Sequence, residues 1–153
     1  MTQERLFTVR QENYTSNDYW TPKWIFDALG LEFDLDVACP PDGPMFTPCK
    51  NFFTQETDGL LAEWYGTVFM NPPFSELTPW VDKYIEHKEG ICLLPYSKSK
   101  WFNRLWNELD GMVAIPRGRA AFVQGDIFLP CFLGSLGKVS TEALINSKIG
   151  RVR

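Results

Sequence analysis

The chain has 153 residues, of which 44% are hydrophobic and 22% are charged, which is enough for one compact domain with its own core. The formal net charge of −4 argues against a protein that coats nucleic acid non-specifically. The charge is unevenly distributed along the chain. Residues 1–94 carry six Lys/Arg and 15 Asp/Glu, whereas residues 95–153 carry nine Lys/Arg and four Asp/Glu. This asymmetry is compatible with a cationic ligand on one side and phosphates on the other, or with chance clustering of surface charges.

The sequence carries no signal for secretion, a membrane or a metal. The first residues lack the apolar segment of a signal peptide, and no apolar run is long enough to cross a bilayer, so we expect a soluble, cytoplasmic protein. The four cysteines are widely spaced without a CxxC pair, and His87 is the single histidine. Zinc sites need closely spaced ligands, so we expect reduced, buried thiols and no metal site.

The first structural elements are marked by their caps and periodicity. Residues 1–18 are polar and predict a loose N-terminal segment. Residues 21–30, TPKWIFDALG, predict a helix with Thr21 as its N-cap, Pro22 at the first helical position and Gly30 as its C-cap.

The rest of the chain alternates between apolar strands and amphipathic helices. Strands are predicted within residues 31–39, 51–54, 67–70, 90–95, 111–116, 120–123 and 126–135. Helices are predicted within residues 75–88, capped by Ser75 or Thr78, and within residues 97–109. The alternation predicts one α/β domain over residues 1–153, with helices on both faces of a mostly parallel sheet. Consecutive strands late in the chain predict an antiparallel edge of the sheet. Residues 140–153 are predicted to form a basic C-terminal tail.

The stretch VFMNPPF, residues 68–74, places a rigid polar tip at the end of a buried strand. Pro72 and Pro73 have a fixed φ and no N–H, so the carbonyl of Pro72 and the carboxamide of Asn71 form a pair of acceptors that could hold one NH₂ group. Two acceptors on an aromatic amine localise its lone pair for attack on a sulfonium methyl group. Phe74 could stack on the base, which must leave a duplex to reach the tip. The alternative is a proline-rich turn whose phenylalanine belongs to the core.

The context of this tip points to a family. NPPF resembles the (D/N/S)PP(Y/F) motif of amino-methyltransferases that use S-adenosylmethionine. More closely, the chain resembles the phage-type DNA N6-adenine methyltransferase (Dam-like) family. The matching segments fall within residues 17–122 and are NDYWTPKWIFDAL, FDLDVAC, FFTQETDGLLAEWYGTVFMNPPF, WVDK, LLPYSKSKWF and GRAAF. The resemblance implies a Rossmann-like methyltransferase fold, S-adenosylmethionine as the methyl donor and adenine N6 in DNA as the acceptor.

The resemblance also implies roles for individual residues. The catalytic tip would consist of Asn71, Pro72, Pro73 and Phe74. Asp36 would face the positively charged amino group of the donor. The donor pocket as a whole would be formed by Tyr19, Trp20, Thr21, Pro22, Asp36, Ala38, Asp58 and Asn71.

Several of these residues have a simpler interpretation. Asp36 and Asp58 could be turn residues, Thr21 a helix cap, and Trp20 part of the core. The chain also departs from the usual methyltransferase pattern. The loop after the first strand, ACPPDGP, has its glycine late, and the second strand does not end in an acidic residue that could bind the donor ribose.

Basic residues follow the later strands, where DNA would approach. Lys98 and Lys100 come directly after the strand within residues 90–95, and Arg117 and Arg119 flank a glycine. We expect these four residues to contact phosphates, which positions DNA without reading its sequence; the alternative is a solvated basic face. The short chain has no room for a separate recognition domain, so a short site, low specificity or a second subunit in a homodimer is expected.

Two further functions stay open. The NH₂ acceptor could belong to RNA or to a protein glutamine amide, since both present a planar amine. The chain could also be a non-catalytic decoy with a degenerate methyltransferase fold, as the missing glycines and the acidic total charge would allow.

Overall fold

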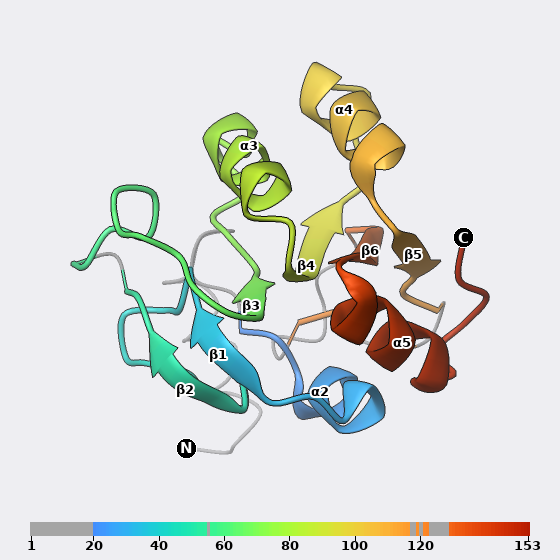
Figure 1. The fold of residues 1–153 in the computed structure, drawn as a ribbon, viewed down its shortest axis with the longest axis horizontal. Coiled ribbons are helices and arrows are strands. Elements are labelled where there is room, and N and C mark those ends of the chain that lie inside the picture. The colour runs from blue at the N-terminus through green and yellow to red at the C-terminus, as the bar shows by residue number, and fades with distance from the viewer. Residues whose placement is uncertain (1–19, 55, 117–118, 120, 123–128) are drawn as a thin grey trace, which may run out of the picture.

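The computed structural model describes residues 20–54, 56–116, 119, 121–122 and 129–153. The described chain forms four helices and six strands, and the strands form a central sheet (Figure 1). The helices are α2 (Lys23–Leu29), α3 (Thr78–His87), α4 (Lys100–Glu108) and α5 (Lys138–Asn146). The strands are β1 (Phe33–Asp36), β2 (Cys49–Phe52), β3 (Val68–Met70), β4 (Gly90–Pro95), β5 (Gly111–Ala114) and β6 (Cys131–Leu136).

The sheet of the described chain has six strands in the order β2-β1-β3-β4-β6-β5. β2, β1, β3 and β4 pair in parallel, whereas β6 is antiparallel to both β4 and β5. The prediction of a mostly parallel α/β sheet is therefore confirmed, with antiparallel pairing confined to one side. The antiparallel strand β6 is not at the edge of the sheet. The chain passes from β4 through α4 to β5, which forms the edge, and β6 then pairs between β4 and β5.

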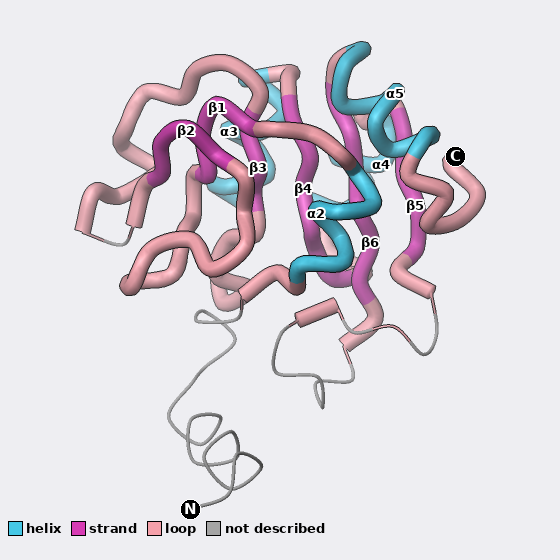
Figure 2. The backbone as a smooth tube through the Cα atoms, turned by 90° about the horizontal axis from the view of Figure 1, so that it is seen from below, coloured by secondary structure: helices cyan, strands magenta, loops and turns pink. Residues whose placement is uncertain are grey.

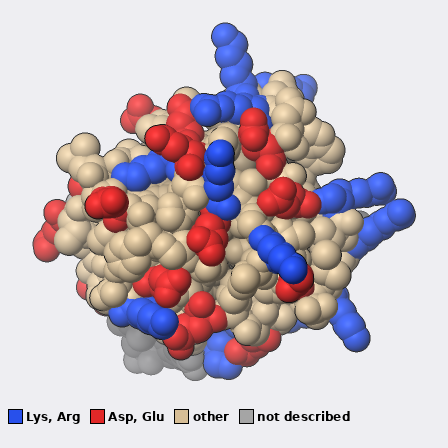
Figure 3. Space-filling view, viewed as in Figure 1, with Lys and Arg blue, Asp and Glu red and all other residues tan. Residues whose placement is uncertain are grey.

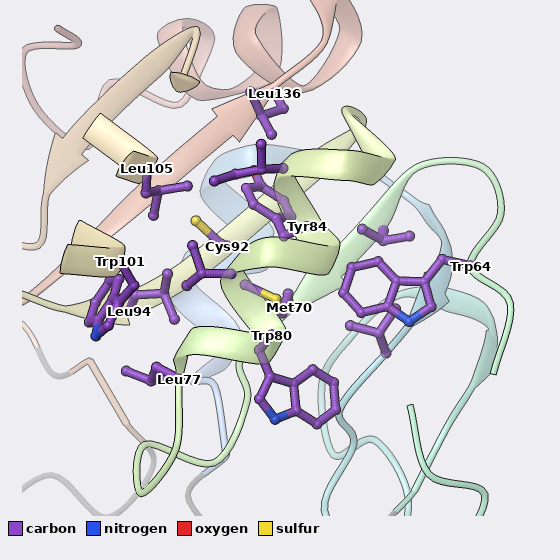
Figure 4. Packing of buried hydrophobic residues seen from close by; sticks show 14 of the residues in the cluster. Trp64, Met70, Leu77, Trp80, Tyr84, Cys92, Leu94, Trp101, Leu105 and Leu136 are labelled. Carbon is purple, nitrogen blue, oxygen red and sulfur yellow. The ribbon is translucent and has the colours of Figure 1, made fainter. Parts of the chain in front are cut away.

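Helices cover both faces of the sheet, as predicted. On one face, α3 and α4 pack on the strands, and the buried side chains of this layer shown in Figure 4 include Met70, Trp80, Tyr84, Cys92, Leu94, Trp101 and Leu105. On the other face, α2 and α5 bury Ile25, Phe26, Leu29 and Leu144. Neighbouring side chains of β4 alternate between the two layers, as the pleat of a strand requires, which explains why all six of its residues are buried.

Two of the predicted helix caps are wrong. The N-cap of α2 is Pro22, and the hydroxyl of Thr21 accepts a hydrogen bond from Asn71 instead of capping the helix. The N-cap of α3 is Leu77, and neither Ser75 nor Thr78 caps it. The C-cap at Gly30 is confirmed, with φ of 59° in the left-handed region.

The end of the chain is more ordered than a tail. Residues 138–146 form α5, which the sequence did not predict because its apolar periodicity is weak. Beyond it, the backbone N–H and C=O of Arg153 exchange hydrogen bonds of 2.8 Å with Met112 in β5. The predicted strand within residues 120–123 is not present at Ala121 and Phe122, and the rest of it, like residues 1–18, lies outside the described residues.

The parallel strands end at the same edge of the sheet. The carboxyl ends of β1, β3 and β4 lie at the edge drawn lowest in Figure 2, next to the start of α2. In open α/β sheets, ligands bind beyond this edge, at points where neighbouring strands connect to opposite sides.

Candidate active site

A small cavity with a volume of about 10 Å³ lies at the carboxyl ends of β1 and β3. The residues that line it fall into two groups. Five were predicted for the donor pocket, namely Trp20, Thr21, Asp36, Ala38 and Asn71. The others, which sequence reasoning missed, are Phe69 and the loop residues Pro40, Pro44, Met45, Phe46 and Thr47. Residues 50 positions apart in the chain thus meet around one space.

Asp36 is the buried carboxylate of this cavity, with 3% of its surface exposed. The backbone N–H of Ala38 donates to its Oδ1 at 3.2 Å. Burial raises the pKa of Asp36 to about 6, while hydrogen bonds from Ala38 and Thr47 act in the opposite direction. Among the described residues, no basic side chain forms an ion pair with this buried carboxylate.

Asn71 follows β3 and is held by a long-range hydrogen bond. Its Nδ2 donates to Oγ1 of Thr21 at 3.0 Å. Thr21 is buried, with 6% of its surface exposed, and sits directly before α2. Because the NH₂ end of the carboxamide is directed to Thr21, the carbonyl end of Asn71 is turned away from it.

The rest of the NPPF tip is packed rather than extended into solvent. Pro72 is buried, and Pro73 and Phe74 are half-buried. The ring of Phe74 lies edge-on to that of Phe122, with 5.7 Å between centroids, and Phe122 itself is 1% exposed. The structure therefore brings the NPPF and GRAAF segments together, although Pro72, Pro73 and Phe74 do not line the cavity.

Asp58 is not among the residues that line the cavity. It is exposed, has a φ of 47°, and its Oδ1 accepts a hydrogen bond of 3.1 Å from the N–H of Leu60. This is the turn role that the sequence allowed. The turn still lies close to β1, because a Cβ on Gly59 would sit 2.0 Å from the carbonyl oxygen of Val37.

The two remaining donor-pocket predictions lie apart from the cavity lining. Pro22 is buried at the N-cap of α2 and does not line the cavity, and Tyr19 lies outside the described residues.

The loop that connects β1 to β2 closes the cavity on one side. Met45 and Phe46 line the cavity yet keep 42% and 38% of their surfaces exposed, so this wall is partly open to solvent. The sequence could have indicated Met45 and Phe46 as cavity residues only through their position, because they lie in the loop that follows the strand with Asp36.

The predicted DNA-contacting residues flank the same edge of the sheet. Lys98 and Lys100 are exposed at the start of α4. On the opposite face, the exposed Arg119 places its guanidinium 3.8 Å from the ring centroid of Trp24 in α2. Arg117 lies outside the described residues. On the face shown in Figure 3, basic and acidic side chains are interspersed, and this view contains no continuous basic surface.

The described residues show neither a metal site nor a membrane-spanning helix. These contain no group of three or more His, Cys, Asp or Glu side chains placed to hold a metal ion. The four cysteines are free thiols, of which Cys39, Cys92 and Cys131 are buried. Within the same residues, no helix has the length and apolar character needed to span a bilayer.

Comparison with known proteins identifies the family. The sequence model of the family "DNA N-6-adenine-methyltransferase (Dam)" matches residues 10–130. The chain belongs to this family. The match contains both the strand that carries Asp36 and the NPPF tip.

Two phage proteins share this relationship, and each is described as a DNA N-6-adenine-methyltransferase. The protein of Haemophilus phage HP1 (strain HP1c1) is 29% identical over 133 residues, which cover 79% of this chain and 75% of the relative. The protein of Escherichia phage T1 is 32% identical over 117 residues, which cover 62% of this chain and 48% of the relative. No solved structure matches the chain.

Proposed function

We propose that this protein transfers the methyl group of S-adenosylmethionine to N6 of an adenine that is extruded from DNA. The family match and the names of the two phage relatives support adenine N6 methylation. The observation that carries the proposal is the cavity in which Asp36 from the end of β1 and Asn71 from the end of β3 face the same space. Acting on DNA inside a bacterial host, the enzyme would work in the cytoplasm.

The architecture favours a Rossmann-like methyltransferase sheet. Parallel strands with helices on both faces end at the edge that holds the cavity. Neighbouring strands β1 and β3 meet there, and this is where such sheets bind nucleotide-like ligands.

The chemistry of the cavity fits a cationic donor. When bound, S-adenosylmethionine supplies an electrophilic methyl group on a sulfonium and a positively charged ammonium group. A buried carboxylate without an ion-pair partner, as Asp36 is among the described residues, gains a favourable interaction when a cation enters. Trp20, Phe69 and Phe46 supply apolar walls, which is the usual composition of a small-molecule site. The loop that contains Met45 and Phe46 would have to move outward to admit a nucleoside, because the cavity of about 10 Å³ has room for about one water molecule.

The tip would prepare the acceptor amine. The carbonyl oxygens of the Asn71 carboxamide and of Pro72 would accept the two N–H bonds of adenine N6, which localises the nitrogen lone pair. That pair would attack the methyl group that the donor supplies, leaving the S–C bonding electrons on sulfur, and N6 would then release one proton to solvent. Holding the two reacting groups in line provides much of the acceleration.

Thr21 would position the catalytic amide. A threonine hydroxyl can accept or donate, and here it accepts from Nδ2 of Asn71 at 3.0 Å. The bond fixes which end of the carboxamide points toward the adenine. Thr21 also lines the cavity, so the donor pocket and the tip share one residue.

The decisive experiment is methylation of DNA with labelled donor, followed by mapping of N6-methyladenine by sequencing. The wild-type protein should modify DNA, and Asn71→Ala should lose turnover by roughly 100-fold or more while it keeps donor binding, in line with the loss of one transition-state hydrogen-bonding group. Turnover of Asn71→Ala at the wild-type rate would contradict the role of the tip.

The same assay separates the alternatives. RNA and protein substrates are incubated in parallel, and label in either one without label in DNA would favour that substrate class. Calorimetry with S-adenosylmethionine tests the decoy, because a protein that binds no donor cannot be a methyltransferase of this kind.

A further inference from the structure

Three aromatic side chains form a row on the outside of the sheet, from the end of β4 along α4. They are Tyr96, Phe102 and Trp106, and we call them the aromatic row. The centroids of Tyr96 and Phe102 are 6.0 Å apart, and those of Phe102 and Trp106 are 6.4 Å apart with nearly parallel planes. Tyr96 and Trp106 expose 43% and 54% of their surfaces. Phe102, between them, is half-buried and packs on Phe132 of the core, so the row joins two exposed rings through one that is anchored in the core. Large exposed apolar side chains that lie together are typical of an interaction surface.

The row begins beside the catalytic tip. β3 and β4 pair in parallel, and the last paired residues are Met70 and Cys92. Phe74 lies four positions beyond Met70, the last residue of β3, and Tyr96 directly follows Pro95, the last residue of β4, so both stand just past the carboxyl ends of neighbouring strands. Adjacent strands are about 4.8 Å apart, which places the start of the row at the edge of the sheet where the adenine would be held.

The ring of Tyr96 is supported from below. Its centroid lies 5.2 Å from that of Phe132, which is fully buried in β6. The backbone N–H of Tyr96 donates to the carbonyl of Pro130 at 3.1 Å. One side of the ring is therefore fixed by the core while the remainder faces solvent.

The charges beside the row suit a phosphate backbone. Lys98 and Lys100 are exposed between Tyr96 and Phe102 in the chain, and within the described residues neither forms an ion pair. Arg104, on the same helix, is instead paired with Asp82 of α3. The two lysines thus keep their charge for a ligand that approaches along the aromatic row.

We propose that the aromatic row stacks on nucleobases of the DNA strand that flank the extruded adenine, with Tyr96 holding the base next to it. Lys98 and Lys100 contact the phosphates of the same strand. Sequence-tolerant single-strand sites combine these two features, since every base has a face that stacks on an aromatic ring. The proposal rests on the proposed function, because it places the strand by the position of the target adenine.

A second copy of this chain is a poorer occupant. In a symmetric dimer the same surface meets itself, so the two pairs of lysines would be brought together without counter-charges. Nucleic acid supplies the negative charge that this surface lacks.

The first test measures binding of a fluorescein-labelled oligo(dA) strand, which requires no methylation. Tyr96→Ala and Tyr96→Leu should weaken binding roughly 5- to 150-fold, the range expected for the loss of one stacked base, while Tyr96→Phe stays close to wild type. Tyr96→Leu keeps an apolar contact with Phe132 and so separates stacking from folding. Trp106→Ala should give a smaller loss, because it lies farther from the tip.

The matched control is Tyr65→Ala. Tyr65 exposes 45% of its surface, close to the value for Tyr96, but precedes β3 at the opposite edge of the sheet. This variant should bind oligo(dA) like wild type. Equal affinities for the Tyr96→Leu and Tyr65→Ala variants would overturn the proposal, as would a dimer in sedimentation that Trp106→Ala dissociates.

The second test uses a duplex that carries the mapped methylation site with 2-aminopurine beside the target adenine. Stacking on Tyr96 should quench its fluorescence, and Tyr96→Leu should relieve this quenching without changing donor affinity. If the wild-type protein methylates DNA but the quenching is the same in both proteins, the aromatic row is refuted while the proposed function stands. If the wild type forms no N6-methyladenine, the proposed function fails, and oligo(dA) binding still reports on the row.

Discussion

Two aspartates of the same strand illustrate the difference between the two ends of the sheet. Asp34, near the start of β1, accepts a hydrogen bond of 2.9 Å from the N–H of Thr67 and lies 3.5 Å from the ammonium of Lys50. The N–H of Thr67 is the main reason that its pKa is lowered. Asp36, at the end of the strand, is buried with few partners, and its pKa is raised to about 6.

The contrast separates a carboxylate that the fold itself satisfies from the one that we propose faces a ligand. The fold itself satisfies Asp34, and Gly66 is fitted so closely to it that a Cβ there would lie 2.2 Å from Oδ2. Asp36 is desolvated at some cost in stability, which a protein keeps where a ligand returns the lost interaction. Thr67 and Thr21 repeat the contrast, since the hydroxyl of Thr67 donates to Glu89 whereas that of Thr21 accepts from Asn71 of the NPPF tip.

The largest expected effect is on donor binding. Asp36→Asn removes the charge that would face the donor ammonium, and we expect affinity for S-adenosylmethionine to fall by roughly 30-fold or more, as when one member of a buried charge pair is removed. Asp34→Asn should bind like wild type. Isothermal titration calorimetry measures both, and equal affinities for the two variants would end the distinction between the aspartates.

In the absence of donor, substitutions of Asp36 and Asp34 should change the free energy of unfolding in opposite directions. Because the folded-state pKa of Asp36 is raised from 3.8 to about 6, the folded state binds its proton more tightly than the unfolded state, so the stabilisation is present below about pH 4 and is lost as pH rises through 6. Asp36→Asn should therefore raise the free energy of unfolding by about 2–3 kcal/mol at pH 7 and change it little at pH 4.

The matched variant should behave in the reverse way. Asp34→Ala removes hydrogen bonds and should lower the free energy of unfolding by about 1 kcal/mol at neutral pH. Urea denaturation at the two pH values measures both variants, and a neutral-pH loss of stability in Asp36→Asn would contradict the assignment.

The pH dependence of donor binding is the next effect in size. Asp36 must be ionised to attract a cation, so the affinity of the wild type should fall by up to about tenfold between pH 6 and pH 5, and change little above pH 7. Asp36→Asn has no proton to lose and should show a flat profile in this range. A wild-type profile as flat as that of the variant would remove Asp36 from the binding equilibrium.

The smallest effect concerns the two threonines. Thr21→Val keeps the shape of the buried side chain but removes the acceptor for Asn71, and kcat should fall by about fivefold, the value of one neutral hydrogen bond, with the donor KM little changed. Thr21→Ser should restore the rate. Thr67→Val is the control at the other end of the sheet. Steady-state kinetics measure the three variants. Equal rates for the two valine variants would contradict the positioning role of Thr21.

Much of the fold and of the site follows from local patterns. The stretch GICLLP predicts β4 with the observed bounds, because a six-residue apolar run that begins at a glycine and ends at a proline is typical of a strand buried on both faces. Asp36 and Asn71 were placed together because the carboxyl ends of parallel strands meet at one edge, a rule that needs no knowledge of distant contacts. The sequence by itself therefore determined the layered α/β architecture and the pairing of the two polar strand ends.

Tertiary structure decided what depends on contacts between distant parts of the chain. Thr21 has the residue type of a helix cap, and only the approach of Asn71 shows that its hydroxyl serves the tip. The place of β6 inside the sheet and the formation of α5 depend on which strand and which face of the sheet the rest of the chain leaves free. They do not follow from the hydrophobic periodicity of their own segments. Hydrogen bonds and burial between segments far apart leave no periodic signal, so they appear only when the chain is folded.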